Sequence, residues 1–130
     1  MILLDTHVVV WLALEPKRLS TKAIKAIQRA RKEDAGVAIC TGTLYEIARG
    51  VERGRIQITD SLEIFLGEIA SRFRILPISV PIAIRAAQMP ASFPGDPIDR
   101  IIAATAMVEK IRLVTADDRI RKSEIVATIW

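Results

Sequence analysis

Short, continuously apolar runs recur along the chain, and segments with helical periodicity separate them. Apolar runs of this length that alternate with helices are typical of a parallel sheet whose two faces are both covered by helices. We therefore predict an α/β protein with three layers, α/β/α, around a central, mostly parallel sheet of four to five strands. The expected strands are residues 2–4, 37–40, 74–78, 112–115 and, as the fifth, 125–129.

Residues typical of helix starts precede most of the segments between these runs. Ser20 is expected to cap a helix over residues 21–33, and Asp60 to open another. Thr43 and Glu46 have the spacing of a capping box, in which Thr43 caps a helix that runs to about residue 53. The other expected segments are a short helix over residues 82–88, a loop over 89–95 and a helix that follows Asp96.

The length of 130 residues fits one domain, which we expect to span residues 1–130. A composition of 51% hydrophobic and 26% charged residues is that of a globular chain rather than a disordered one. The single cysteine, Cys40, excludes an intrachain disulfide. No apolar stretch reaches the roughly 18 residues of a membrane span, and the first residues lack the pattern of a signal peptide. We expect a cytoplasmic protein with no membrane contact.

The net charge of +4 is unevenly distributed. Seven basic residues and no acidic one lie between Lys17 and Lys32. A field of this kind favours a polyanion such as nucleic acid. The alternative, a helix face that is merely solvated, remains open.

Four acidic residues are expected to meet at one edge of the sheet. Asp5 ends the first strand, Glu46 lies in the first turn of the helix after the second, and Asp117 follows the fourth. Because the expected strands are parallel and joined by right-handed crossovers, their carboxyl ends lie along one edge, where ligands bind. Asp99 joins the other three if its helix also begins at that edge.

Four carboxylates in one pocket repel one another. One such pair about 4 Å apart costs about 4 kcal/mol at an effective dielectric constant near 20, whereas a helix cap contributes only about 1 kcal/mol. Convergence therefore requires raised pKa values or a bound cation. An all-oxygen ligand set suits Mg²⁺ or Mn²⁺ rather than Zn²⁺. Taken singly, each acid can also be explained as a cap or a turn residue.

Other chemistries find little support in the sequence. The chain has no glycine-rich phosphate loop and no GxSxG motif. The single histidine, His7, cannot build a metal cluster, and we expect it to pack or hydrogen-bond near the site rather than to act as a base.

Four motifs in order, LLDTH with Trp11 after it, TLYEIA, DPIDRIIAATA and LVTADD, resemble those of PIN-domain ribonucleases. Within that family they are most similar to the VapC type of toxin from toxin–antitoxin systems, and the resemblance covers essentially the whole chain. It implies a PIN fold and Mg²⁺- or Mn²⁺-dependent cleavage of RNA. It also implies a cognate antitoxin bound over the active site, and a homodimer. The acidic cluster that it implies is Asp5, Glu46, Asp99 and Asp117.

Two positions in these motifs are ambiguous. Asp96 stands before Pro97 and has the form of an N-cap, so we interpret it as the residue that starts the helix and Asp99 as the one that holds the metal. LVTADD offers both Asp117 and Asp118, of which we choose Asp117. The side chains expected to contact the RNA backbone are Arg49, Arg100 and the basic face formed by Lys22, Lys25, Arg29 and Lys32.

Two other functions remain as alternatives. One is a non-catalytic PIN-like module that binds RNA or a protein partner without cleaving RNA. The other is a phosphatase of the haloacid dehalogenase type, which needs a second aspartate two residues after the first, where this chain has His7.

Overall fold

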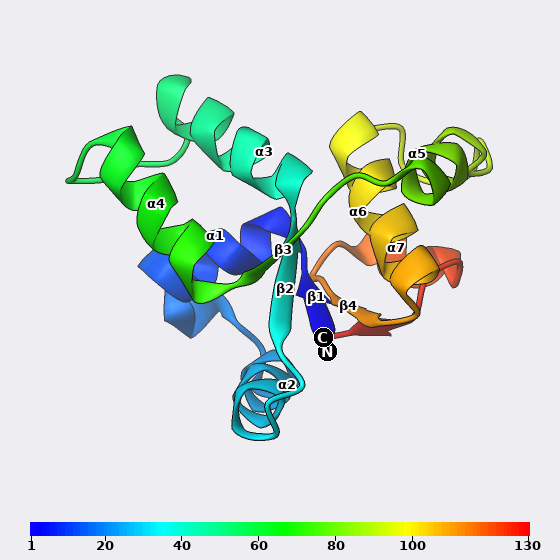
Figure 1. Ribbon diagram of the computed structural model, residues 1–130, viewed down its shortest axis with the longest axis horizontal. Helices are drawn as coiled ribbons and strands as arrows, with labels where there is room; N and C mark the ends of the chain where they lie inside the picture. The colour runs from blue at the N-terminus through cyan, green and yellow to red at the C-terminus, as the bar shows by residue number, and fades with distance from the viewer.

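Five parallel strands form a single sheet at the centre of the computed structural model, which describes residues 1–130 (Figure 1). The strands lie in the order β3-β2-β1-β4-β5, and every neighbouring pair is parallel. Their bounds are β1 Ile2–Leu4, β2 Val37–Cys40, β3 Arg74–Leu76, β4 Arg112–Val114 and β5 Thr128–Ile129. The predicted α/β/α architecture and the fifth strand are confirmed, although β5 is shorter than expected.

Side chains of the central strands point alternately into two separate cores. On β1, Leu4 joins a cluster with Val8 of the following helix, whereas Leu3 joins a second cluster on the opposite face. On β2, Ile39 and Cys40 divide in the same way. Because both faces are covered, both alternating sets are apolar, which explains the continuous apolar runs in the sequence.

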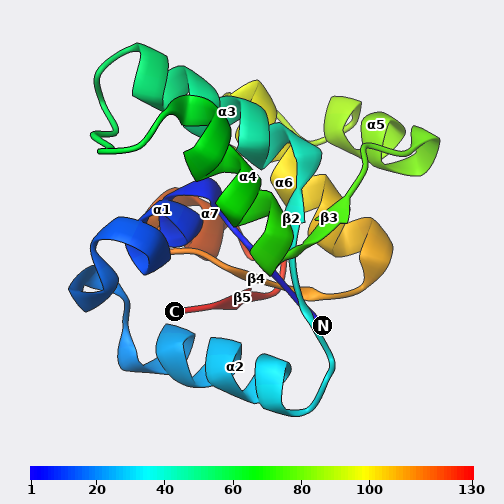
Figure 2. The ribbon, with the colours of Figure 1, turned by 60° about the vertical axis from the view of Figure 1, so that its left-hand side comes forward.

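Helices cover the two faces of the sheet in separate groups (Figures 1 and 2). One group is α1 Thr6–Leu14, α2 Thr21–Lys32, α3 Thr41–Glu52 and α4 Leu62–Arg72, with a short 3₁₀ turn, η1 Pro16–Arg18, after α1. The other group is α5 Val80–Ala87, α6 Pro97–Glu109 and α7 Asp118–Ser123. In the second group, α5 packs on α6 through Ile82, Ala86 and Ala104. None of these helices has the length and hydropathy required to traverse a bilayer.

The predicted helix starts are partly correct. Ser20 caps α2 as expected, and its Oγ accepts a 3.0 Å hydrogen bond from the backbone N–H of Ala23. Asp60 does not open the next helix, because the adjacent Ser61 caps α4 instead.

The capping box expected at Thr43 is wrong. Strand β2 passes directly into α3, and the Sγ of Cys40 accepts from the N–H of Gly42 at the start of the helix. Thr43 is therefore buried inside the helix, where its hydroxyl accepts a hydrogen bond from that of Thr6. Glu46 lies in the second turn rather than the first, so its carboxylate is not needed for capping.

The order of the strands creates a switch point between β1 and β4. The chain adds β2 and β3 on one side of β1 and then crosses to add β4 and β5 on the other. Such a point leaves a crevice at the carboxyl ends of the strands, which is where open α/β sheets bind ligands. Asp5 follows β1 here, and Thr115 to Asp117 follow β4.

Candidate active site

Asp5 is buried at the switch point, with 2% of its surface exposed. Its Oδ1 accepts a 2.8 Å hydrogen bond from the backbone N–H of Thr6 and caps α1. Its Oδ2 accepts a 2.8 Å hydrogen bond from the hydroxyl of Thr115. Burial raises the pKa of Asp5 although His7 and both hydrogen bonds act to lower it. The hydrogen bonds and charges of the protein therefore do not fully offset the cost of burying an ionised carboxylate at this position.

His7 joins the start of α1 to the turn after β4. The backbone N–H of Ala116 donates a 2.9 Å hydrogen bond to Nε2 of His7. An imidazole nitrogen that accepts a hydrogen bond carries no proton, so the ring proton is on Nδ1, which faces Asp5 Oδ2 at 3.7 Å. His7 thus lies beside the buried carboxylate and hydrogen-bonds near the site, as predicted.

Glu46 and Asp99 approach Asp5 from two helices that rise on opposite faces of the sheet, α3 and α6 (Figure 1). Burial, followed by the charge of Asp5 and those of the other acids nearby, raises the pKa of Asp99 to about 7. Burial also raises the pKa of Glu46, with Asp96 and Asp5 adding to the effect and the Thr6 hydroxyl opposing it. For both groups burial is the largest cause of the raised pKa, and the charges of neighbouring carboxylates add to it.

Asp96 belongs to the same cluster, in addition to its predicted role as the N-cap of α6. Its Oδ1 accepts hydrogen bonds from the N–H groups of Ile98 and Asp99 and caps α6, as predicted, with Pro97 in the first helical position. Carboxylate oxygens of Glu46, Asp96 and Asp99 nevertheless lie within 4.8 Å of one another. The N-cap residue and the residue three positions later occupy the same end of the helix, so one helix start delivers two acids.

Asp117 lies at the margin of the cluster. It caps α7, a helix that the sequence did not predict, through hydrogen bonds from the N–H groups of Arg119 and Ile120 to its Oδ1. Its Oδ2 is 3.6 Å from the guanidinium of Arg119. Its charge still contributes to the raised pKa values of Asp5 and Asp99. Asp118 is exposed and pairs with Arg121.

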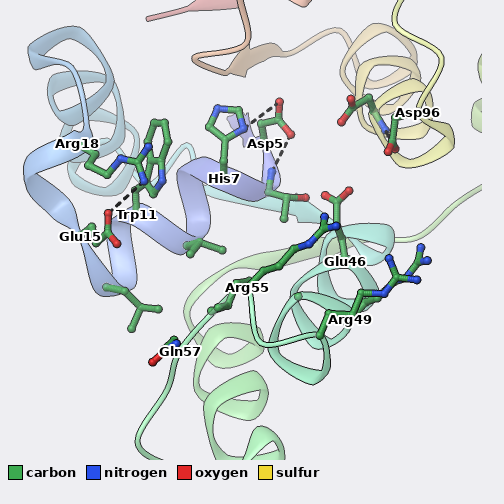
Figure 3. Close-up of a pocket in the computed structure, with 17 residues that line it drawn as sticks. Asp5, His7, Trp11, Glu15, Arg18, Glu46, Arg49, Arg55, Gln57 and Asp96 are labelled. Carbon is green, nitrogen blue, oxygen red and sulfur yellow. Dashed lines mark hydrogen bonds and ion pairs between the residues drawn. The ribbon is translucent and has the colours of Figure 1, made fainter.

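The acids line one part of an open cleft of about 820 Å³ (Figure 3). Asp5, Glu46 and Asp96 face a common space from β1, α3 and α6. Another part of the same wall is basic and is formed by Arg18, Arg49, Arg53 and Arg55. A cleft with carboxylates in one part and guanidinium groups in another can hold a cation and an anionic substrate side by side.

Comparison with known proteins identifies the fold. The model of the PIN domain family matches residues 2–125. The chain belongs to the PIN domain family. It is 38% identical to "Ribonuclease VapC22" of Mycobacterium tuberculosis over 131 residues, which cover 99% of this chain and 98% of the relative. The predicted family resemblance is therefore confirmed.

Solved structures agree with this assignment. FitAcB from Neisseria gonorrhoeae superposes with a TM-score of 0.70 at 27% identity, covering 98% of this chain and 96% of that one. VapBC2 from Rickettsia felis, solved bound to a DNA fragment from its promoter, gives a TM-score of 0.74 at 19% identity, with 98% and 97% covered. At 19% identity, the likeness to VapBC2 establishes only the PIN fold.

The donor set of this PIN domain fits a hard divalent cation. Oxygens about 2.1 Å from one Mg²⁺ are at most about 4.2 Å apart, so small side-chain rotations bring Glu46, Asp96 and Asp99 to ligand distance. Zn²⁺ fits poorly, because Cys40 is buried in the core and Nε2 of His7 is already occupied.

Two predicted RNA contacts lie elsewhere in this PIN domain. The guanidinium of Arg100 donates hydrogen bonds to four backbone carbonyls of the loop before α6, those of Met89, Pro90, Phe93 and Pro94. It therefore holds that loop and does not line the cleft. The predicted basic face of α2 also lies outside the cleft: Lys22, Lys25 and Arg29 line a separate groove, and Lys32 lines neither.

Proposed function

We propose that this PIN domain is an Mg²⁺- or Mn²⁺-dependent endoribonuclease and the toxin of a toxin–antitoxin pair. The observation that carries the proposal is the convergence of acids from β1, α3 and α6 on one cleft, with raised pKa values at Asp5, Glu46 and Asp99. Buried carboxylates that also repel one another are tolerated where a cation neutralises them. The 38% identity to Ribonuclease VapC22 over nearly the whole chain supports RNA as the substrate.

In this proposal Asp5, Glu46 and Asp99 hold the metal, and Asp96 joins them through the oxygen that does not cap α6. Asp117, the fourth predicted acid, contributes negative charge to the site. Its carboxylate does not hold the metal in this proposal, because it is largely engaged in capping α7. A bound divalent cation supplies Lewis acidity, which polarises the scissile phosphate and lowers the pKa of a water molecule.

The protein's own side chains position the RNA. Arg49, Arg53 and Arg55 line the cleft and have no carboxylate within 4.0 Å, so they are available for phosphate oxygens. Contacts to phosphates give affinity and register without reading the base sequence. His7 and Thr115 keep the buried Asp5 carboxylate in one orientation.

We further propose a cognate antitoxin that covers the cleft, a homodimer, and action in the cytoplasm, where cellular RNA is accessible. An antitoxin with a carboxylate or phosphate-like group suits the exposed arginines of the cleft. The homodimer is supported by an apolar patch at α5, where Val80 is 74% and Ile84 is 51% exposed. Light scattering of the purified chain tests the dimer.

Cleavage of RNA by metal-stripped protein, with and without added Mg²⁺ or Mn²⁺, tests the proposed activity. Activity that appears with the ion and disappears with chelator is expected. RNA binding without cleavage under all ionic conditions would favour the non-catalytic module. Turnover of a small phosphomonoester with RNA left intact would favour the phosphatase, although His7 occupies the position where that class needs an aspartate.

A further inference from the structure

A second groove, of about 750 Å³, lies between α2 and the end of the sheet at β5. It shares no lining residue with the acidic cleft. Its charged lining is mostly basic and comprises Lys22, Lys25, Arg29, Arg112, Arg121 and one acid, Glu33. We call it the basic groove.

The basic groove carries positive charge that the protein leaves unpaired. Glu33 is engaged by Arg29 at 2.9 Å, and Arg121 pairs with Asp118 at 3.2 Å. Lys22 and Lys25 have no carboxylate within 4.0 Å. Two free ammonium groups one helical turn apart, in a concave surface, attract a chain of negative charges rather than a single anion.

Two tryptophans connect the basic groove to the acidic cleft. Trp11 lines the cleft and Trp130 lines the groove, and their ring centroids are 5.9 Å apart. Figure 2 shows the C-terminal end of the chain, which carries Trp130, between α1 and α2. The guanidinium of Arg18 lies 4.1 Å from the centre of the Trp11 ring. The two hollows therefore meet at an aromatic pair with a cation beside it.

We propose that the basic groove is an extension of the substrate site, which binds the phosphate backbone of a single-stranded RNA whose scissile bond lies in the acidic cleft. Trp130, which is partly exposed, provides the surface on which bases between the two hollows stack, whereas one face of Trp11 is already covered by Arg18. Basic grooves lined with aromatic rings are the usual means of holding single strands without sequence preference. This inference rests on the proposed ribonuclease function and adds where the rest of the substrate lies.

A matched pair of double variants tests it. Lys22→Gln with Lys25→Gln removes two charges from the groove, whereas Lys17→Gln with Lys32→Gln removes two charges from exposed residues that line neither hollow. Cleavage is measured on a long RNA of about 16 nucleotides and a short one of about 4 nucleotides, which bracket the site sizes of single-strand binders.

The groove variant is expected to raise KM for the long RNA about tenfold at 0.1 M salt and to lower the slope of log affinity against log salt by about 1.4, which is about 0.7 for each lost phosphate contact. Its kcat, and its KM for the short RNA, stay at the values of the unaltered protein. The control variant changes neither. Equal KM values for the two variants, or an equal rise in KM on the long and the short RNA, would overturn the proposal that RNA binds in the basic groove.

Binding without cleavage separates this inference from the proposed function. With chelator present, the fluorescence anisotropy of labelled long RNA reports its affinity even if no metal activates the protein. Loss of affinity only in the groove variant supports the groove even where cleavage is absent, and so where the proposed function fails. Poly-glutamate that binds the groove as tightly as RNA of equal charge assigns it to an acidic protein partner and overturns the RNA proposal.

The stacking surface has its own readout. Trp11 and Trp130 are the only two tryptophans of the chain, so tryptophan fluorescence, excited at a wavelength that Tyr45 does not absorb, reports on this pair alone. Saturation with the long RNA is expected to quench it, and Trp130→Phe to retain affinity that Trp130→Ala loses. Unchanged emission at saturation overturns the stacking role.

Discussion

The hydroxyl of Thr115 donates a 2.8 Å hydrogen bond to Oδ2 of Asp5, although the two residues are 110 positions apart in the sequence. The bond joins the carboxyl ends of β1 and β4, the two strands that flank the switch point. It fixes the one acid of the cluster that has almost no access to water.

Replacing Thr115 with valine tests this bond while keeping the shape of the side chain. We expect the free energy of unfolding to fall by about 1–3 kcal/mol, because the buried Asp5 carboxylate loses a donor and the backbone N–H of Asp117 loses its acceptor. Affinity for Mn²⁺ falls as well, since the pKa of Asp5 rises further without the bond. Urea unfolding and Mn²⁺ titration measure the two effects. Thr105→Val is the control, because that buried hydroxyl bonds only to the Ile101 carbonyl within α6; an equal loss of Mn²⁺ affinity there would contradict the account.

Asp99→Asn is expected to stabilise the metal-free protein at neutral pH. Because the folded-state pKa of Asp99 is raised to about 7 from 3.8, its neutral form favours folding, and that benefit is lost as pH rises from about 4 to about 7. The asparagine avoids the loss. We expect a gain of about 1–3 kcal/mol at pH 8, discounted for partial exposure, and a smaller gain at pH 5.

Thermal unfolding with chelator at both pH values measures this gain. Asp118→Asn is the matched control, because Asp118 is exposed and outside the cluster. A gain that is equal at the two pH values, or equal in the control, would show that Asp99 is not under electrostatic stress.

Metal affinity is expected to depend on pH through the same carboxyl. Binding requires Asp99 to be ionised, so Mn²⁺ affinity should fall by up to about tenfold for each unit below pH 7 and should level off above it. Calorimetric titration between pH 5.5 and 8.5, a range on both sides of about 7, measures the curve. A flat profile for the unaltered protein would argue against Asp99 as a ligand.

Arg100 is expected to act on the site through the loop before α6 and not through RNA. Arg100→Gln leaves four loop carbonyls without their donor, so we expect a loss of about 1–3 kcal/mol in stability and a lower metal affinity, because Asp96 follows that loop. Steady-state cleavage should show reduced kcat with little change in KM for RNA. A raised KM for RNA in Arg100→Gln, with normal kcat and normal Mn²⁺ affinity, would contradict this account and support a contact between Arg100 and the RNA backbone.

Much of the fold is predictable because local and tertiary preferences agree. The strands β1, β2 and β4 are buried on both faces, so apolar and polar residues do not alternate along them, and this pattern is visible in the sequence alone. The start of α3 is not predictable in the same way. Thr43 and Glu46 satisfy the spacing of a capping box, but β2 leads straight into the helix and the cap falls on Cys40.

The candidate site is predictable in outline. The strand end of Asp5 and the helix start of Asp99 are predicted correctly, and the structure brings both together with Glu46, although Glu46 lies one turn further into its helix than expected. The part played by Asp96 depends on how closely α3 and α6 approach, which no local signal records. Arg100 illustrates the same limit: a basic residue in a motif suggests a phosphate, yet its donors are taken by the carbonyls of an irregular loop.

Cleavage of RNA by Asp99→Asn beside Asp118→Asn tests the central claim most directly. The two variants make the same chemical change nearly the same distance from a helix start, one inside the acidic cluster and one outside it. With Mg²⁺ or Mn²⁺ at saturation, we predict that Asp118→Asn cleaves RNA as the unaltered protein does. Asp99→Asn, although folded, is predicted to lose at least about a hundredfold in rate, the scale on which loss of a single transition-state-stabilising group slows an enzyme. Undiminished, chelator-resistant cleavage by Asp99→Asn would contradict the account.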